Sequence, residues 1–371
     1  MTRSARIGLS CLALAAAFRV FPSAQQLRPA FKTGVDVVRV DFRVLDSHGA
    51  FVDGVTADDV QVFESGRQQA ISTFDRVSLS TSAEAERTFV LLLDDATGHP
   101  LRGATVRAIA RKFVADYMQP TDRVALMTTS ERKALNVPLT GDKTRLLEAI
   151  DRYEGWYGAA GSAGALYVLR DLANALSTPG DRKSIVFISE GLGSNLPDLL
   201  RAGPPEYANL LDEVELAKAE RASRRTIFEA FQRIDGSSAV DLRDVVAAAA
   251  RNNVSIYAID PTGAPGTRAA DIKPIPYLAP PESVVAVRPL RRSPGQDAMA
   301  VAATETGGAA LLGSNNFDGA LSRVVDDANS HYVLGYVSSN SKKDGSYRRI
   351  EVRTKPGLYV RARTGYVAPK G

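Results

Sequence analysis

The chain has 371 residues, of which 44% are hydrophobic and 24% charged, a composition that excludes disordered, collagen-like and disulfide-framed proteins. Its length allows a full core and a smaller second unit. The formal charge of +4 includes Arg3, Arg6 and Arg19 of an acid-free start of 24 residues, so the remainder carries +1. A nearly neutral chain has no net field that draws it onto phosphate, which argues against nucleic acid as a partner.

Residues 1–24 have the pattern of a secretory signal peptide. Arg3 and Arg6 precede an apolar run from Ile7 to Phe18, and Pro22-Ser23-Ala24 places a small residue before a cleavage point. The run is too short to anchor the chain in a bilayer. We therefore expect an exported protein, periplasmic or extracellular, without a transmembrane anchor; the alternative is an amphipathic start that is not cleaved.

The only cysteine, Cys11, lies inside this apolar run. A processed chain would carry no thiol, which excludes disulfides, a cysteine nucleophile and a thiolate metal site.

Residues 35–84 predict a small β unit. Residues 35–44 end in alternating apolar and polar positions, the period of a half-buried strand, and residues 60–63 and 70–74 predict two further strands around the turn at Ser65-Gly66.

Residues 86–330 change to an alternation of strands and helices. The apolar run Thr88–Leu93 predicts a parallel strand covered on both faces. Further strands are expected at 124–128, 184–189, 254–259 and 309–312, and helices at 104–117, 143–152, 163–176, 242–251 and 317–328. This order predicts a doubly wound α/β sheet, mostly parallel, whose ligand crevice opens at the carboxyl ends of the strands.

Two stretches interrupt the alternation, and a third follows it. Residues 200–235 predict an inserted helical excursion, and the proline-rich residues 261–296 a structureless loop. Residues 331–369 return to a strand pattern. We expect this last segment to pack with the N-terminal β unit, so that one β-sandwich-like domain is discontinuous in sequence.

A carboxylate directly follows the first apolar strand of the α/β region. The run Leu91–His99, with Asp94 just past the strand, resembles the start of the metal-ion-dependent adhesion site of von Willebrand factor type A (VWA) domains, D-x-S-x-S. The resemblance implies a Mg²⁺ held by this aspartate, two serine hydroxyls, a threonine from a second loop and an aspartate from a third. Here the two serine positions are Ala96 and Gly98.

The other two loops also depart from the VWA pattern. Ser162 offers the only hydroxyl in the second loop, and Glu190 stands where the family has aspartate. The implied metal ligands are therefore Asp94, Ser162 and Glu190, for Mg²⁺ or alternatively Mn²⁺ or Ca²⁺. The opposite interpretation, a VWA scaffold that has lost its metal, stays open, and no other cofactor is expected.

Sequence blocks at both ends of the chain resemble the secreted bacterial family of VWFA-related proteins. At the N-terminal end they are residues 46–55, 59–66 and 69–74, and at the C-terminal end Tyr332-Val333-Leu334-Gly335-Tyr336, residues 350–352 and 361–366. The resemblance spans residues 35–369, and the roles of these blocks are structural.

Enzyme signatures are weak, and we predict no catalytic and no cofactor-binding residues. Residues 160–164 lack the first glycine of a nucleophile elbow, and the glycines after residue 190 lack the third glycine of a dinucleotide loop. A hydrolase using Glu190 and His99 is the remaining enzymatic alternative, but nothing in the sequence orients either group.

Trp156 and Tyr157 lie between two glycines beside the expected crevice. Aromatic side chains in such a loop suit protein contact, or they anchor the loop to its own sheet. The sequence thus predicts an exported, non-catalytic protein-interaction or adhesion module. The alternative is a structural or assembly component of the cell envelope that acts without metal and associates with itself or its neighbours.

Overall fold

The central element of the fold is a six-stranded sheet with the order β10-β9-β8-β5-β6-β7. The computed structural model describes residues 37–79, 86–96, 102–130, 133–155, 163–177, 182–192, 237–263 and 294–371. Within these residues, neighbouring strands of the sheet pair in parallel except at the antiparallel edge strand β7. The strands are β5 (Thr88–Leu93), β6 (Arg123–Thr128), β7 (Val137–Thr140), β8 (Lys183–Ile188), β9 (Val254–Ile259) and β10 (Ala310–Leu311).

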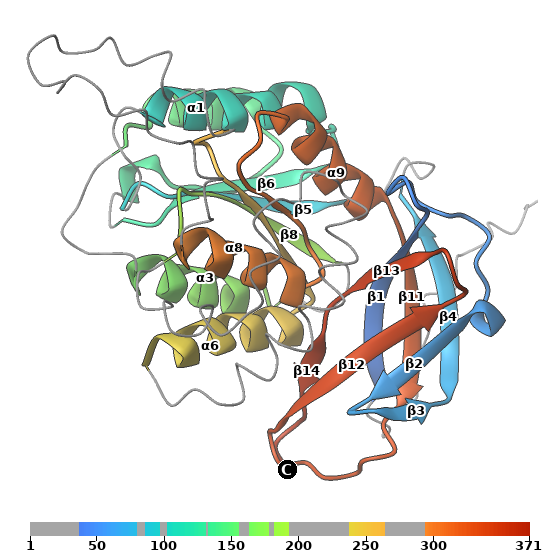
Figure 1. The fold of residues 1–371 in the computed structure, drawn as a ribbon. Coiled ribbons are helices and arrows are strands. Elements are labelled where there is room, and N and C mark those ends of the chain that lie inside the picture. The colour runs from blue at the N-terminus through green and yellow to red at the C-terminus, as the bar shows by residue number, and fades with distance from the viewer. Residues whose placement is uncertain are drawn as a thin grey trace, which may run out of the picture. The chain divides into compact units, whose positions relative to one another are not determined.

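Helices cover both faces of this sheet (Figure 1). On one face pack α1 (Gly103–Lys112), which continues into a π-helical turn at Phe113–Tyr117, α2 (Lys143–Asp151) and α9 (Phe317–Asn329). On the other face pack α3 (Ala163–Ala175), α6 (Ser237–Arg251) and α8 (Pro294–Glu305). Because both faces are covered, strands such as β5 are apolar at every central position, and the predicted doubly wound sheet is confirmed.

Two four-stranded antiparallel sheets form the β unit, with the orders β13-β1-β11-β4 and β14-β12-β2-β3. The strands from the N-terminal part are β1 (Val37–Leu45), β2 (Val60–Glu64), β3 (Arg67–Gln69) and β4 (Ile71–Ser78), with a 3-10 turn at Ala57–Asp59. Those from the C-terminal part are β11 (Ser330–Val337), β12 (Tyr347–Thr354), β13 (Tyr359–Ala362) and β14 (Gly365–Val367). Strand β11 lies between β1 and β4, and β12 pairs with β2, so the predicted discontinuous β unit is confirmed.

The carboxylate of Asp327 joins the β unit to the α/β sheet. Asp327, on α9, is fully buried and forms ion pairs with Arg43 of β1 and Arg361 of β13. It also accepts a hydrogen bond from the Tyr257 hydroxyl of β9 at 3.0 Å. Arg182 in turn donates to the same hydroxyl at 3.1 Å. One buried charge therefore connects two strands of the β unit with a helix and a strand of the α/β sheet.

Several elements differ from the expected ones. Strand β7 and helix α8 were not predicted, and α8 begins at Pro294, so the last residues of the expected loop 261–296 are helical. Helix α8 buries Ala298, Met299, Val301, Ala302 and Ala303, and a helix apolar on most sides shows no amphipathic period. Residues 1–24, 200–235 and 264–293 lie outside the described residues.

Removing residues 331–371 tests the discontinuous β unit. Without β11 and β12, strands β1, β2 and β4 lose their central neighbours and the side chains of Tyr332, Leu334 and Tyr336 from their core. Short hairpins alone are at best marginally stable. We expect limited proteolysis of the truncated chain to cleave residues 37–79 rapidly, while the full chain resists. An equally protected N-terminal segment in the truncated chain would contradict this arrangement.

A buried histidine faces an aspartate at the junction between the β unit and the α/β sheet. His331 is 3% exposed, and its Nε2 lies 3.9 Å from Oδ2 of Asp41. Burial lowers the pKa of His331 to about 4; Asp41 acts in the opposite direction, and Arg182, Arg39 and Arg43 lower it further. The folded chain therefore holds this imidazole neutral at pH values where an unfolded histidine is protonated.

Lowering the pH from 7 to 4.5 should destabilise the fold through His331. In the unfolded chain this histidine is protonated below about pH 6.5, whereas in the folded chain it is protonated only below about pH 4. The free energy of unfolding is therefore unaffected by this side chain above pH 6.5 and decreases as the pH falls from 6.5 towards 4. We expect this side chain alone to account for about 2–3 kcal/mol between pH 7 and 4.5. Urea unfolding of wild type and His331→Asn at both pH values measures it, with the exposed His48→Asn as control. An identical pH dependence in wild type and His331→Asn would refute the assignment.

Candidate functional site

The central sheet changes direction of winding between β5 and β8. These two strands pair in parallel, with Leu93 opposite Ile188 at their carboxyl ends. The helix after β5, α1, packs on one face of the sheet, whereas α6, after β8, packs on the other. The two helices thus lie on opposite faces of the sheet, and the carboxyl ends of the strands at such a reversal point are where open α/β sheets bind ligands.

Asp94 lies at this reversal point, directly after β5, and is 1% exposed. Its Oδ1 accepts a hydrogen bond from the Thr129 hydroxyl, and its Oδ2 one from the Ser189 hydroxyl, both at 2.6 Å. Thr129 follows β6 and Ser189 follows β8, the two strands that flank β5. A buried charge requires such donors, and here they fix the orientation of the carboxylate from both sides.

The two hydroxyl groups also hold the surrounding backbone. The oxygen of Thr129 accepts a hydrogen bond from the Ala96 amide at 3.2 Å, and the oxygen of Ser189 one from the Gly191 amide at 3.0 Å. A hydroxyl oxygen has one proton and two lone pairs. Each of these oxygens donates to Asp94 and accepts one amide, and within the described residues each keeps a second lone pair.

Two further buried carboxylates lie at the same edge of the sheet. Asp95, fully buried, accepts hydrogen bonds from the Ser130 amide at 2.8 Å and from the Ser130 hydroxyl at 2.5 Å. Asp260, directly after β9, accepts hydrogen bonds from the Thr262 hydroxyl at 2.7 Å and from the side-chain amide of Gln296 at 2.5 Å. Asp94, Asp95 and Asp260 are therefore three oriented, buried acids at the carboxyl ends of β5 and β9, two strands separated by β8.

The loop after β8 is packed tightly against the start of α8. Leu192 donates its amide to the Gly295 carbonyl at 3.0 Å. A Cβ atom on Gly191 would lie 3.2 Å from the Gly295 Cα, and one on Gly295 would lie 3.0 Å from the Leu192 carbonyl oxygen. Only glycine at both positions leaves this approach unhindered, so the contact fixes the loop that carries Ser189 and Glu190.

The structure places part of the predicted site. Asp94 and Glu190 follow neighbouring strands, and Glu190, half-buried, is adjacent in sequence to the serine that binds Asp94. Ser162, Trp156, Tyr157 and His99 lie outside the described residues. The ligand set Asp94, Ser162 and Glu190 and the partner contacts Trp156 and Tyr157 therefore stay predictions.

Sequence reasoning missed Thr129, Ser130, Ser189 and Asp260. Each of them stands at or just after the end of a parallel strand, and that position was the available signal. The D-x-S-x-S pattern predicts the hydroxyl groups on the loop after β5. In the structure the hydroxyl groups that bind Asp94 come instead from the two neighbouring strands.

The described residues at this edge of the sheet offer oxygen atoms of the kind that divalent cations bind. Asp94, Thr129 and Ser189 offer one carboxylate and two hydroxyl oxygens, the ligand type that Mg²⁺ and Ca²⁺ prefer. Among the described residues, no group of three or more His, Cys, Asp or Glu side chains could hold an ion. A cation here would be bound mainly by the two hydroxyl oxygens, and the carboxylate of Asp94, to which they donate, would supply the negative charge.

Removing one of the two hydroxyl groups should destabilise the fold measurably. Thr129→Val and Ser189→Ala each leave one oxygen of a buried carboxylate without its donor, which typically costs about 1–3 kcal/mol. Urea unfolding measures the loss. Ser322→Ala, whose hydroxyl donates to the exposed Asp326, serves as the control and should change the stability by less than about 0.5 kcal/mol. Unchanged midpoints for both crevice variants would contradict the hydrogen bonds.

No protein-family model and no curated protein matches the chain. The search of solved structures finds VWA-type domains. An aerotolerance-related membrane protein from Bacteroides fragilis is 14% identical, covers 66% of this chain and 98% of its own, and gives a TM-score of 0.36. The vWF domain of the type V pili tip protein Mfa5 from Porphyromonas gingivalis is 12% identical, covers 67% of this chain and 96% of its own, and gives a TM-score of 0.37.

A von Willebrand factor type A structure from Catenulispora acidiphila is 8% identical, covers 92% of this chain and 75% of its own, and gives a TM-score of 0.36. All three TM-scores lie below 0.5. By strand order and helix placement, strands β5–β10 and the helices on their two faces form the doubly wound α/β sheet that the resemblance to VWA domains implies. It is joined to a β unit built from strands β1–β4 and β11–β14.

Proposed function

We propose that the chain is a non-catalytic protein-interaction or adhesion module that presents the crevice between β5 and β8 to a protein partner. The observation that carries the proposal is the buried carboxylate of Asp94, which lies at the point where the sheet reverses its winding. Hydroxyl groups that follow the two neighbouring strands bind this carboxylate and fix its orientation. A site oriented from rigid strands suits recognition, because little conformational freedom is lost when a partner binds.

The hydrogen bonds of the acids favour recognition over proton transfer. The carboxylates of Asp94, Asp95 and Asp260 each accept at least two hydrogen bonds from protein donors. A general base must be free to take a proton from a substrate. Carboxylates engaged in this way act as fixed acceptors and as a source of negative charge.

A weakened metal site is part of the proposal. Asp94, Thr129 and Ser189 would hold a Mg²⁺, Mn²⁺ or Ca²⁺ ion together with the predicted ligands Ser162 and Glu190. When bound, such an ion offers an open coordination position to a carboxylate of the partner, as the resemblance to VWA domains implies. Asp94 would orient the two hydroxyl groups by accepting their hydrogen bonds, which leaves one lone pair on each oxygen for the ion.

Export belongs to the proposal as well, on the basis of the signal-like residues 1–24. In the described parts of the chain, no helix combines the length and apolar character needed to cross a membrane. We place the protein in the periplasm or outside the cell.

A second candidate function, a structural or assembly component of the cell envelope, is favoured by strand β4. This eight-residue strand lies at the edge of its sheet, and β11 is its one partner strand among the described residues. Edge strands of this length pair readily with strands of other chains. Native mass spectrometry separates the two functions, because concentration-dependent self-association is expected of the assembly component.

Substitution of Asp94 tests the interaction module. Isothermal titration of the full chain with Mg²⁺, Mn²⁺ and Ca²⁺ should give binding that Asp94→Asn weakens at least tenfold, since the carboxylate charge is lost while its shape is kept. Asp151→Asn, an exposed acid paired with Arg111, is the matched control and should bind as wild type does.

The same variants are then used to capture partners from cross-linked cell envelopes. We expect Asp94→Asn to fold and to recover less partner than wild type or Asp151→Asn. If none of the three ions gives heat or a thermal shift, the metal site is refuted. If partner recovery is unchanged in Asp94→Asn, the crevice is not the interaction site.

A further inference from the structure

A small cavity of about 10 Å³ lies at the joint between the β unit and the α/β sheet. Two arginines, Arg182 and Arg363, line it together with Asp41. Arg182 directly precedes β8, Arg363 directly follows β13, and Asp41 belongs to β1. The other lining residues come from α6, from β9 and the residue before it, and from the turn after α8: Ala249, Ala250, Asn253, Val254, Ser255, Thr306 and Gly307.

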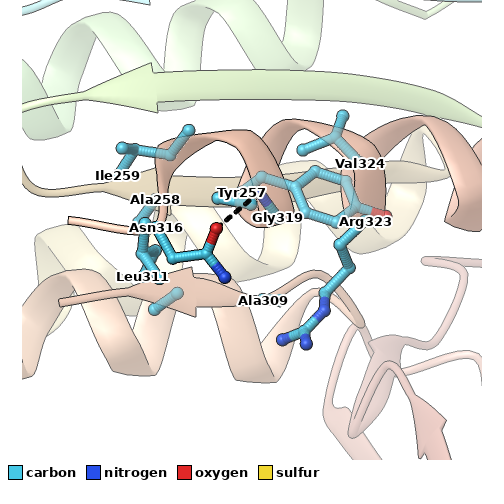
Figure 2. Close-up of a pocket in the computed structure, with 11 residues that line it drawn as sticks. Tyr257, Ala258, Ile259, Ala309, Leu311, Asn316, Gly319, Arg323 and Val324 are labelled. Carbon is cyan, nitrogen blue, oxygen red and sulfur yellow. Dashed lines mark hydrogen bonds between the residues drawn. The ribbon is translucent and has the colours of Figure 1, made fainter. Parts of the chain in front are cut away.

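The charge of Arg182 is contacted by neutral oxygens. Arg182 is 9% exposed, and its side chain donates to the Ser255 hydroxyl at 2.9 Å, the Tyr257 hydroxyl at 3.1 Å and the Gly307 carbonyl at 2.8 Å. Tyr257 also lines the separate cavity that Figure 2 shows, and its ring is directed toward α9, which carries Asp327. Its hydroxyl accepts from Arg182 and donates to Asp327, so it stands between the two charges.

The side chain of Arg363 also meets neutral oxygens. Its Nη1 donates to the Ala250 carbonyl at 2.6 Å, and its Nη2 donates to the Arg39 carbonyl. Its Nε is buried and has no hydrogen-bond partner among the described residues. A buried donor without an acceptor is costly, so an acceptor inside the cavity would stabilise the fold.

Asp41, the carboxylate that lines the cavity, is engaged with other groups. It forms an ion pair with Arg39 at 2.9 Å and accepts a hydrogen bond from the side-chain amide of Asn253 at 2.8 Å. Burial lowers the pKa of Arg363, and the opposing effect of the Asp41 charge does not restore it. The surroundings therefore disfavour the positive charge of Arg363.

Positive charge is thus in excess at this joint. Within the described part of the chain, neither Arg182 nor Arg363 forms an ion pair with a carboxylate, and Asp327 is bound to two other arginines. Buried charges require compensation by groups of opposite sign. An anion beside these two guanidinium groups would supply it.

The volume of the cavity limits the size of such an anion. About 10 Å³ is room for roughly one particle the size of a water molecule. Carboxylates, phosphate and sulfate have several heavy atoms and do not fit, whereas a chloride ion is only slightly larger than water. A water molecule would accept hydrogen bonds here, but it would leave the charges uncompensated.

We propose that this cavity binds a single chloride ion beside the guanidinium groups of Arg182 and Arg363, with Nε of Arg363 as one of its donors. The ion would connect the start of β8 with the end of β13 and so strengthen the joint between the α/β sheet and the β unit. The site is separate from Asp94, and it does not depend on the function proposed above.

Crystallography of the full chain at long wavelength, where chloride itself scatters anomalously, tests the site directly. Crystals grown in sodium chloride should show an anomalous peak in the cavity, within hydrogen-bond distance of Nε of Arg363. Crystals grown in sodium acetate are the control and should lack it. A water molecule without an anomalous peak in the chloride crystals would overturn the proposal.

Thermal unfolding tests whether the ion stabilises the joint in solution. Replacing acetate by chloride at constant ionic strength should raise the unfolding midpoint until it levels off, as a single saturable site requires. Arg363→Gln should abolish this rise, whereas Arg353→Gln, an exposed arginine paired with Glu351, should keep it. No saturable rise in wild type, or the same rise in a folded Arg363→Gln variant, would refute the chloride site.

Discussion

A carboxylate inside a protein must be paired with donors, and this requirement organises both halves of the structure. Asp94 is paired with two hydroxyl groups, Asp327 with two guanidinium groups and a tyrosine, and Glu64 with the hydroxyls of Tyr336 and Tyr366 at 3.0 Å. Removing one partner of a buried ion pair typically costs about 3–5 kcal/mol, because the other charge is left uncompensated. Such groups tie together elements that lie far apart in the sequence.

The two sets of buried acids have different consequences. Asp327 and Glu64 lie within the fold and connect strands and helices, so their role is to hold the β unit together and to join it to the α/β sheet. Asp94, Asp95 and Asp260 lie at the carboxyl edge of the sheet, where the strands end and the chain leaves in opposite directions. The same pairing rule that stabilises the interior here produces a row of fixed, negatively charged acceptors beside a crevice.

The fold class could be predicted from local patterns in the residues. Uninterrupted apolar runs such as Thr88–Leu93 indicate parallel strands covered on both faces, and their alternation with amphipathic helices indicates a doubly wound sheet. Helix α8 was not predicted because it is apolar on most sides and so shows no amphipathic period. Strand β7 was not predicted because it is a short edge strand. Asp94 could be singled out because its position after a buried strand is a local property.

The partners of that acid could not be predicted, because they come from distant parts of the chain. Thr129 and Ser189 stand 35 and 95 residues further along the chain, and their contact with Asp94 depends on which strands become neighbours of β5. Strand order is set by the packing of the helices on the two faces, and no local pattern encodes it.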